Sequence, residues 1–280
     1  MEKPKIKKFE FGKIAQTIKQ ISGINLSAEK ESMIRSRLLK RIRALNFKSL
    51  NEYLNYYNND KSGREIYEII DLLTTNKTNF FREKHHFEFI KEVVIPEIKH
   101  RQYFIWSAGC SSGEEPYSIA MLLHSILPES YLSNVKILAT DISTRMIHKA
   151  QEGIYDKESI KELPEYYLEQ YFKPIKSKHG TKYILKNIIK ESVVFAKLNL
   201  MDPWPMKGPF DLILCRNVMI YFDKETRERL INRFLEMLKE NGYLFVGHSE
   251  NLAGIKTSLE YIEPAIYQKP ATERRKKAKL

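Results

Sequence analysis

The sequence predicts an α/β fold in which helices cover both faces of a parallel sheet, preceded by an all-helical domain. Apolar runs alternate with helical patterns between residues 102 and 246, which is typical of a parallel sheet buried on both sides. Residues 9 to about 90 show helical spacing of apolar positions and no strand-period pattern. Residues 155–192 break the alternation with clustered tyrosines and a lysine-rich turn, which predicts a small inserted antiparallel hairpin.

Each element is expected from a local pattern. A helix is expected at 29–45, where four apolar residues from Ile34 to Leu45 fall on one arc, with Ser27 as its N-cap. Further helices are expected at 50–57 and 64–73, on either side of a turn-rich linker. The strands expected in the α/β domain are 103–108, 135–140, 193–200, 210–215 and 243–246, and its helices are 116–127, 143–151 and 224–239.

Composition restricts the class of protein. With 280 residues and 42% hydrophobic side chains, the chain can bury a large core, and it is not of the disordered, collagen-like or disulfide-stapled kind. Its cysteines, Cys110 and Cys215, lie in apolar stretches and are expected to be free thiols in a reducing compartment. The longest apolar stretch, Ile119 to Leu127, is far shorter than the roughly 20 residues of a bilayer span. A cytoplasmic protein is expected.

The net charge of +12 is unevenly distributed. Residues 1–8 and 273–280 are both basic and are expected to be solvated tails, the second within a disordered segment 271–280. Between Ser27 and Leu50 the chain carries seven Lys or Arg against two Glu. Most of these cations fall opposite the apolar arc of the expected helix, which predicts either a docking face for an acidic partner or a plain solvated surface.

A glycine turn follows the first expected strand. Gly109 and Gly113 allow a tight strand-to-helix turn whose backbone can approach a ligand. The segment lacks the three-glycine dinucleotide fingerprint, and Glu115 at the helix start suits a cationic or donor-rich ligand better than a pyrophosphate. Asp141 ends the second strand, where a carboxylate can accept both hydroxyls of a ribose. Together these features favour S-adenosylmethionine over NAD.

Plainer interpretations of the same acids stay open. Acidic residues at a helix start also stabilise the helix through its macrodipole, and that interpretation holds equally well for Glu114. An Asp after a strand is more often the N-cap of the next helix, here the one beginning near Ser143.

Four blocks then resemble the CheR family of chemotaxis receptor methyltransferases, which methylate glutamate side chains of chemoreceptors. They are Thr75–Glu83, Ser107–Ser118, Cys215–Asp223 and Gly247–Leu252, in family order. The resemblance implies a Rossmann-like S-adenosylmethionine-dependent methyltransferase domain at 91–270. It also implies an all-α N-terminal domain at 1–90 and a β-subdomain inserted at about 155–192.

The resemblance also assigns residues. It implies that the cofactor, or its product S-adenosylhomocysteine, contacts a set drawn from all of these blocks and from the third strand. Arg82 and Tyr221 are expected to orient the incoming carboxylate, and no metal is expected. The cofactor set is Asn76, Thr78, Arg82, Glu115, Asp141, Asn199, Leu200, Arg216 and Asn217.

The implied partner is the cytoplasmic domain of a chemoreceptor, whose methylated helices are acidic. The basic helix would then be the docking face, through Arg37, Lys40, Arg41 and Arg43. A receptor C-terminal peptide could add to the edge of the β-subdomain, although the turn there has only Gly180 among basic residues. A monomer without membrane insertion is expected.

Two other functions compete with this one. The basic pI of about 9.4 is compatible with a nucleic-acid methyltransferase, but Arg216–Tyr221 lacks the paired prolines that usually accompany base methylation. A non-catalytic S-adenosylmethionine-binding regulator would be expected to have lost Arg82 or Tyr221, and both are present.

Overall fold

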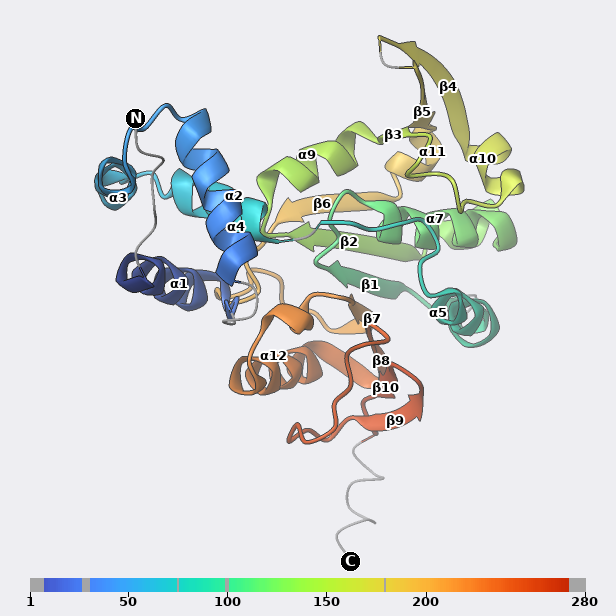
Figure 1. Cartoon of the computed structure of the whole chain (residues 1–280). Helices are drawn as coiled ribbons and strands as arrows, with labels where there is room; N and C mark the ends of the chain where they lie inside the picture. Colours follow the sequence, from blue (N-terminus) through green and yellow to red (C-terminus); the bar gives the residue numbers. More distant parts are fainter. Residues whose placement is uncertain (1–7, 27–30, 75, 99–100, 179, 272–280) are drawn as a thin grey trace, which may run out of the picture. The chain divides into compact units, whose positions relative to one another are not determined.

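The computed structural model describes residues 8–26, 31–74, 76–98, 101–178 and 180–271 (Figure 1). The expected N-cap Ser27 and nearly all of the basic tail lie outside these ranges. The chain divides into two compact units, Met1–Asn76 with Tyr221–Thr226, and Lys77–Ile220 with Arg227–Leu280. Each unit is described by itself.

The first unit is helical. Its helices are α1 (Lys8–Ser22), α2 (Glu31–Ala44), α3 (Leu50–Asn59) and α4 (Arg64–Leu73), which confirms the three helices expected after residue 29. The apolar arc of α2 is buried at Ile34, Leu38 and Ile42. A short segment from far along the sequence completes the unit, because Phe222 forms a β-bridge with Ile24 and Lys19 pairs with Asp223 at 2.7 Å.

The second unit is built on a sheet that has seven strands among the described residues, in the order β6-β2-β1-β7-β8-β10-β9 (Figure 1). The first five are parallel, and β10 and β9 are antiparallel to their neighbours. Five of these strands were expected, and β1 and β7 match the expected ranges at both ends. The bounds are β1 (Tyr103–Ala108), β2 (Val135–Asp141), β6 (Val193–Lys197), β7 (Phe210–Cys215), β8 (Leu238–Val246), β9 (Glu260–Glu263) and β10 (Ile266–Gln268).

Side chains alternate between the two faces of the sheet. On one face, Tyr103 and Ile105 of β1 belong to a core shared with α7 (Glu114–Ile126), α5 (Lys84–Phe89), η2 (Ile90–Val94) and α6 (Ile95–Ile98). On the other, Trp106 packs on Phe234 of α12 (Lys224–Met237), with ring centroids 5.3 Å apart. The remaining helices are α8 (Glu129–Leu132), α9 (Thr144–Glu152), α10 (Glu165–Tyr171), α11 (Asn187–Lys190) and the 3-10 turn η3 (Met219–Tyr221).

The division between the units lies before α5, whereas the sequence placed the domain boundary near residue 90. Helix α5 carries the helical pattern that extended the expected N-terminal domain. Its buried face, however, packs in the core of the sheet through Phe87 and Phe89. Helical periodicity predicts that one face of a helix is buried. It does not predict which of two cores that face packs against.

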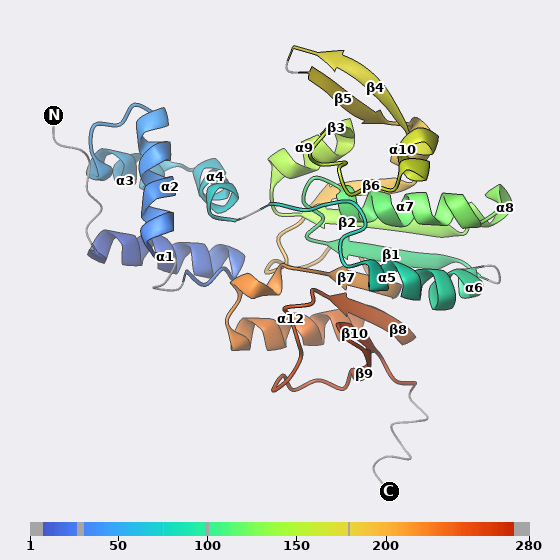
Figure 2. The same ribbon diagram turned by 45° about the vertical axis from the view of Figure 1, so that its right-hand side comes forward.

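The inserted segment forms a separate sheet with three strands among the described residues, in the order β3-β5-β4. Strands β4 (Phe172–Ser177) and β5 (Gly180–Leu185) make the expected antiparallel hairpin, and β3 (Ile154–Asp156) adds to β5. Figure 2 shows the hairpin extending away from the large sheet. Phe172 and Tyr155 contact Phe80 edge-on and anchor the insert to the core.

Candidate active site

The sheet has a topological switch point beside β1. The chain passes from β1 through α7 to β2 on one side, and later returns from β6 to β7 on the other side. In open α/β sheets the carboxyl ends of two such strands border a ligand crevice. A ligand site is therefore expected among the residues that follow β1 and β7, around Gly109 and Arg216.

The turn after β1 requires glycine. Gly109 has φ of +90°, and a Cβ there would lie 2.4 Å from Cγ2 of Val218. Gly113 has φ of +92° and caps the start of α7. Between them, the backbone N–H of Ser111 donates to Oδ2 of Asp141 at 2.8 Å, which ties the turn to the end of β2.

Asp141 therefore shapes the glycine turn and is not the N-cap of the next helix. Ser143 fills the cap position of α9, where its Oγ accepts from the N–H of Met146 at 3.1 Å. The other carboxylate oxygen of Asp141 accepts from the N–H of Ser143 at 2.9 Å. The acid of the adjacent helix start, Glu114, turns inward onto Ser112, and burial raises the pKa of its carboxyl.

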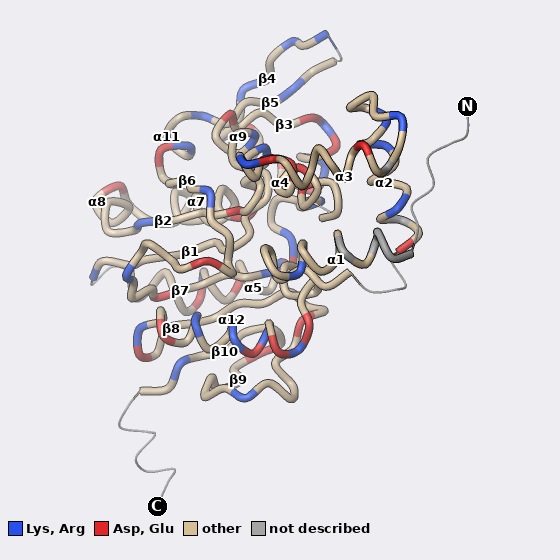
Figure 3. Tube along the Cα trace, turned by 90° about the vertical axis from the view of Figure 1, so that its left-hand side faces the viewer, with Lys and Arg blue, Asp and Glu red and all other residues tan. Residues whose placement is uncertain are grey.

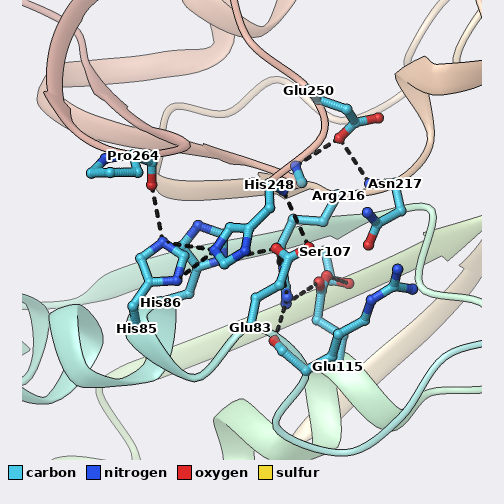
Figure 4. Close-up of polar contacts among 12 residues, drawn as sticks. Glu83, His85, His86, Ser107, Glu115, Arg216, Asn217, His248, Glu250 and Pro264 are labelled. Atoms are coloured by element: carbon cyan, nitrogen blue, oxygen red, sulfur yellow. Dashed lines mark hydrogen bonds and ion pairs between the residues drawn. The ribbon is translucent and has the colours of Figure 1, made fainter.

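Glu115 and Arg216 connect the ends of β1 and β7 (Figure 4). Ser107 Oγ donates to Oε1 of Glu115 at 2.7 Å, and the Arg216 guanidinium donates to Oε2 at 2.9 Å. The Arg216 side chain is 3% exposed and that of Glu115 is 12% exposed. A buried guanidinium with one carboxylate would be neutral as a pair, but Arg216 has a second acidic partner.

That partner is Glu83, which the sequence did not assign to the site. Oε2 of Glu83 accepts from Arg216 at 3.1 and 3.2 Å, and Oε1 accepts from the backbone N–H of His248 at 3.2 Å. Burial raises the pKa of this carboxyl, but the Arg216 charge and the hydrogen bonds outweigh it, so the pKa is lowered overall. Glu83 thus stays ionised.

Glu250 binds the backbone that follows β7 and β8. The sequence did not assign this residue to the site either. Its carboxylate accepts from the backbone N–H groups of Asn217, Ile220 and Gly247, at 2.8, 3.0 and 2.6 Å. Asn217 has φ of +59°, and these bonds hold the backbone after β7 in that conformation. Burial raises the pKa of Glu250 despite the three donors. Both missed acids end a block or lie within one, but no local pattern separates them from ordinary surface glutamates.

The turn after β6 contains Asn199 and Leu200, both buried. The Asn199 amide accepts from the N–H of Met201 and donates to Oδ1 of Asp202, each at 3.1 Å. Its side chain therefore shapes this turn. Trp204 Nε1 donates to the carbonyl of Leu200 at 3.3 Å.

Four expected residues contribute no side chain to the contacts described above, although the backbone carbonyl of Arg82 accepts from the Arg216 guanidinium. Thr78 is half-buried in an irregular segment, and Arg82 is exposed, with Nη1 donating to the Lys77 carbonyl at 3.3 Å. Asn76 and Tyr221 belong to the first unit. Their roles stay predictions.

The residues that do gather fit S-adenosylmethionine in charge and in position. Arg216 meets two carboxylates, those of Glu83 and Glu115, and a third carboxylate, that of Asp141, accepts from the glycine turn. The resulting excess of negative charge suits a ligand that carries a sulfonium and an ammonium group. The hydrogen bond from the Ser111 N–H to Asp141 holds the glycine turn and this carboxylate together at the edge of the sheet where a nucleoside binds.

Comparison with known families identifies the chain. Residues 10–74 match the all-alpha domain of CheR methyltransferase, and residues 76–267 match its SAM-binding domain. The chain belongs to the CheR methyltransferase family. It is an S-adenosylmethionine-dependent methyltransferase of chemotaxis, in agreement with the resemblance read from the sequence, and its fold is the one that resemblance implied.

Similar proteins align over most of their length. A chemotaxis protein methyltransferase of Borreliella burgdorferi is 43% identical over 273 residues, covering 94% of this chain and 95% of the relative. Those of Klebsiella aerogenes and Escherichia coli are 41% and 40% identical, each covering 88% of this chain and 84% and 85% of the relative.

Helix α2 of this CheR family member carries several Lys and Arg residues along its length (Figure 3), but not all of their side chains are available to a partner. Arg37 donates to two carbonyls at the end of α4, at 3.0 and 3.1 Å. Arg41 pairs with the buried Glu65 at 2.8 Å. Lys40 and Arg43 are exposed. Two of the four expected docking residues therefore stabilise the helical unit.

Two further observations concern the described residues alone. No helix among them is both long and apolar enough to cross a bilayer. They also contain no group of three or more His, Cys, Asp or Glu side chains arranged to hold a metal ion.

Proposed function

We propose that this CheR family member transfers a methyl group from S-adenosylmethionine to glutamate side-chain carboxylates of chemoreceptors, forming methyl esters. The observation that carries the proposal is a cluster of acids at the carboxyl edge of the sheet, where Glu83 and Glu115 bind Arg216 and Asp141 binds the glycine turn. This cluster favours a cationic cofactor at the carboxyl edge of the sheet. We also propose that the protein works in the cytoplasm as a monomer.

In this proposal the cofactor is held by residues of both strand ends. Asp141 accepts the ribose hydroxyls, and Glu115 lies toward the amino-acid portion. Asn199 and Leu200 flank the adenine, while Arg216 and Asn217 close the pocket. When bound, the cofactor supplies a methyl carbon activated by the adjacent sulfonium charge.

The protein has to orient the acceptor more than activate it. A glutamate with an ordinary pKa of about 4.3 is already ionised at neutral pH, so no general base is required. Transfer of the cofactor's methyl group to this carboxylate would require no proton transfer, so the residues of the chain would only have to hold the acceptor in place. Arg82 and Tyr221 align the acceptor carboxylate and exclude water from it.

The alignment role has a direct test. Arg82→Ala is expected to lower turnover, or the affinity for cofactor, by about tenfold or more. Arg82 is exposed and bonds only weakly to Lys77, so the variant should fold normally. Lys77→Ala, an exposed cation five residues away, is the matched control. Kinetics of Arg82→Ala within twofold of wild type would remove Arg82 from the site.

Substrate docking is proposed to use Lys40 and Arg43 on α2. Both are exposed, whereas Arg37 and Arg41 hold the helix in its unit. Lys40→Glu with Arg43→Glu should slow methylation of a receptor fragment most strongly at low salt, while leaving S-adenosylhomocysteine affinity unchanged. Lys91→Glu, an exposed charge in the second unit, is the control. An unchanged rate would mean that α2 is an ordinary surface.

A receptor C-terminal peptide is a further proposed partner, added as a strand beside β4. This strand is the last in its sheet, although Pro174 within it has no N–H to offer. Binding of an acidic receptor-tail peptide, measured by calorimetry, should weaken when Lys176, whose N–H points away from β5 in the register of the hairpin, is replaced by proline. An affinity that does not change would exclude this edge.

The deciding experiment for the reaction uses radiolabelled S-adenosylmethionine with a cytoplasmic receptor fragment. Label that is released by mild base indicates a glutamyl ester and supports the proposal. Label on RNA or DNA instead would indicate a nucleic-acid methyltransferase. No label on any acceptor, with cofactor still bound, would indicate a non-catalytic regulator.

A further inference from the structure

Arg233 lies on α12, outside every block that carries the family resemblance, yet its side chain reaches the turn after β6. Its Nη1 donates to the carbonyl of Leu200 at 2.5 Å, and its Nη2 donates to the carbonyl of Asp202 at 2.6 Å. One guanidinium thus bridges two backbone carbonyls of the same turn. The planar fork of arginine fixes both bonds in one plane, which the flexible ammonium of lysine does less rigidly.

The same guanidinium stacks on an aromatic side chain of that turn. The Arg233 Cζ lies 3.9 Å from the centroid of the Trp204 ring, within the range of a cation–π contact. Trp204 in turn stacks on Phe234 of α12, with centroids 5.3 Å apart, and meets the edge of Trp106 at 4.9 Å. The turn is therefore held by hydrogen bonds to its backbone and by aromatic contacts to its Trp204 side chain.

This aromatic cluster connects the turn to the end of β2. Trp106 is fully buried, and its Nε1 donates to Oγ1 of Thr140 at 2.9 Å. Thr140 precedes Asp141, the residue proposed to bind the ribose. These contacts therefore fix the position of the turn that carries Asn199 and Leu200 relative to the carboxylate of Asp141. Both are proposed to bind the same nucleoside.

We propose that Arg233 is a positioning residue for the adenine side of the cofactor pocket, acting through the Leu200–Trp204 turn. This inference rests on the proposed cofactor contacts of Asn199 and Leu200. Arg233 itself touches the turn and not the cofactor. Without it, the carbonyls of Leu200 and Asp202 lose a charged donor, and the turn can leave the conformation that receives the nucleoside.

The test measures the dissociation constants of S-adenosylhomocysteine and of adenosine by calorimetry for wild type, Arg233→Gln and Arg233→Lys. Arg233→Gln should weaken both ligands by the same factor, about tenfold or more, because the lost support lies at the nucleoside end. Arg233→Lys should fall between wild type and Arg233→Gln. With a receptor fragment, the KM for S-adenosylmethionine should rise and kcat at saturation should stay near wild type.

The control is Arg229→Ala, an exposed residue one turn earlier on α12. It meets the turn only through the sulfur of Met201, at 3.8 Å, and should leave both dissociation constants unchanged. A purely structural role for Arg233 would lower the folded fraction, and hence kcat, without changing KM. Melting temperatures without ligand measure that folded fraction directly.

Several outcomes would overturn the inference. Affinities of Arg233→Gln within twofold of wild type would do so, as would a loss for S-adenosylhomocysteine that adenosine does not share. If Arg233→Gln fails to fold, Trp204→Phe replaces it. That variant keeps the stacking ring but removes one donor to Leu200, and a shared loss of both ligands is again expected. A wild-type protein that binds neither ligand would instead contradict the proposed function.

Discussion

Each end of β7 carries a buried charge with ionised partners around it, and the two buried charges are of opposite sign. At its amino end, Asp211 is 1% exposed and accepts from Arg101 and from Lys239, the latter at 2.9 Å. At its carboxyl end, Arg216 is 3% exposed and donates to Glu83 and Glu115. Each cluster places one buried charge between two partners of opposite charge, but Arg101 also pairs with Glu97 at 2.9 Å, so only the carboxyl-end cluster has one charge in excess.

The difference lies in how the charges at each end are balanced. The side chains of Arg101 and Lys239 are 43% and 29% exposed, so Glu97 and water balance the charge that Asp211 does not. Glu83 and Glu115 are only 10% and 12% exposed, so their surplus negative charge is poorly hydrated and requires another cation. In a cluster that only stabilises the fold, the charges are balanced by the protein and by water. In a ligand site, one buried charge is left for the ligand to balance.

The largest expected effect follows from removing the central charge at the carboxyl end. Arg216→Met leaves Glu83 and Glu115 buried without a counter-ion, which should cost about 3–5 kcal/mol in the free energy of unfolding. S-adenosylhomocysteine affinity should fall about a hundredfold or more, because the pocket wall between β1 and β7 is lost. Urea unfolding and calorimetry measure the two effects separately.

Arg216→Lys is the matched control, since it keeps the charge but cannot serve both carboxylates in one plane. It should retain most of the stability and lose part of the affinity. Wild-type affinity in Arg216→Met would mean that the cluster is structural, like the one at the opposite end of the strand.

A smaller effect is expected at the amino end. Asp211→Asn weakens the bonds to Arg101, to Lys239 and to the N–H of Phe104, the last of which is 2.8 Å long. The loss should be about 2–3 kcal/mol in the free energy of unfolding, because both cations can rehydrate. Affinity for S-adenosylhomocysteine should not change. A variant that loses affinity at equal folded fraction would remove the distinction between the two ends.

The strands were predictable because burial on both faces imposes a continuous apolar run. β1 and β7 were located at both ends for this reason, with every residue of β7 buried. β9 was missed for the opposite reason, since all four of its residues are exposed at the edge of the sheet. A short polar edge strand has no periodic signal.

The site was predictable only as far as its motifs are local. The positions at the ends of expected strands indicate Gly109, Glu115 and Asp141. The resemblance to the family adds Arg216. The contact between Arg216 and Glu83 joins residues 133 positions apart, and no sequence pattern encodes such a pair. The same limit applies to α2, where the bond from Arg41 to Glu65 is visible only after folding.

A third effect, which is the smallest at neutral pH, concerns a buried histidine beside the carboxyl-end cluster. His86 is fully buried and stacks on Phe245, with centroids 4.8 Å apart. Its Nδ1 lies 3.5 Å from Oε2 of Glu83, and neither ring nitrogen has a hydrogen-bond partner among the described residues. Burial, with the nearby charge of Arg216, lowers the pKa of His86 to about 2.

A lowered histidine pKa makes stability depend on pH with a definite sign. The unfolded chain takes up a proton below its ordinary pKa of about 6.5, whereas the folded chain does not. The stability is therefore fully present above pH 6.5 and is lost as pH falls, by about 1.4 kcal/mol per pH unit from this group. His86→Phe keeps a ring on Phe245 and removes the titrating group. It should unfold like wild type at pH 7.5, within about 1 kcal/mol, and show a shallower loss between pH 6 and 4.

Urea unfolding of both proteins at several pH values gives the difference in slope, which isolates His86 from the carboxylates that titrate in the same window. His148→Phe, at an exposed position of α9, is the control and should leave the slope unchanged. Equal slopes for wild type and His86→Phe would mean that His86 accepts a proton in the folded state. Glu83 would then be its partner, and the carboxyl-end cluster would gain the second cation that its charge requires without any ligand.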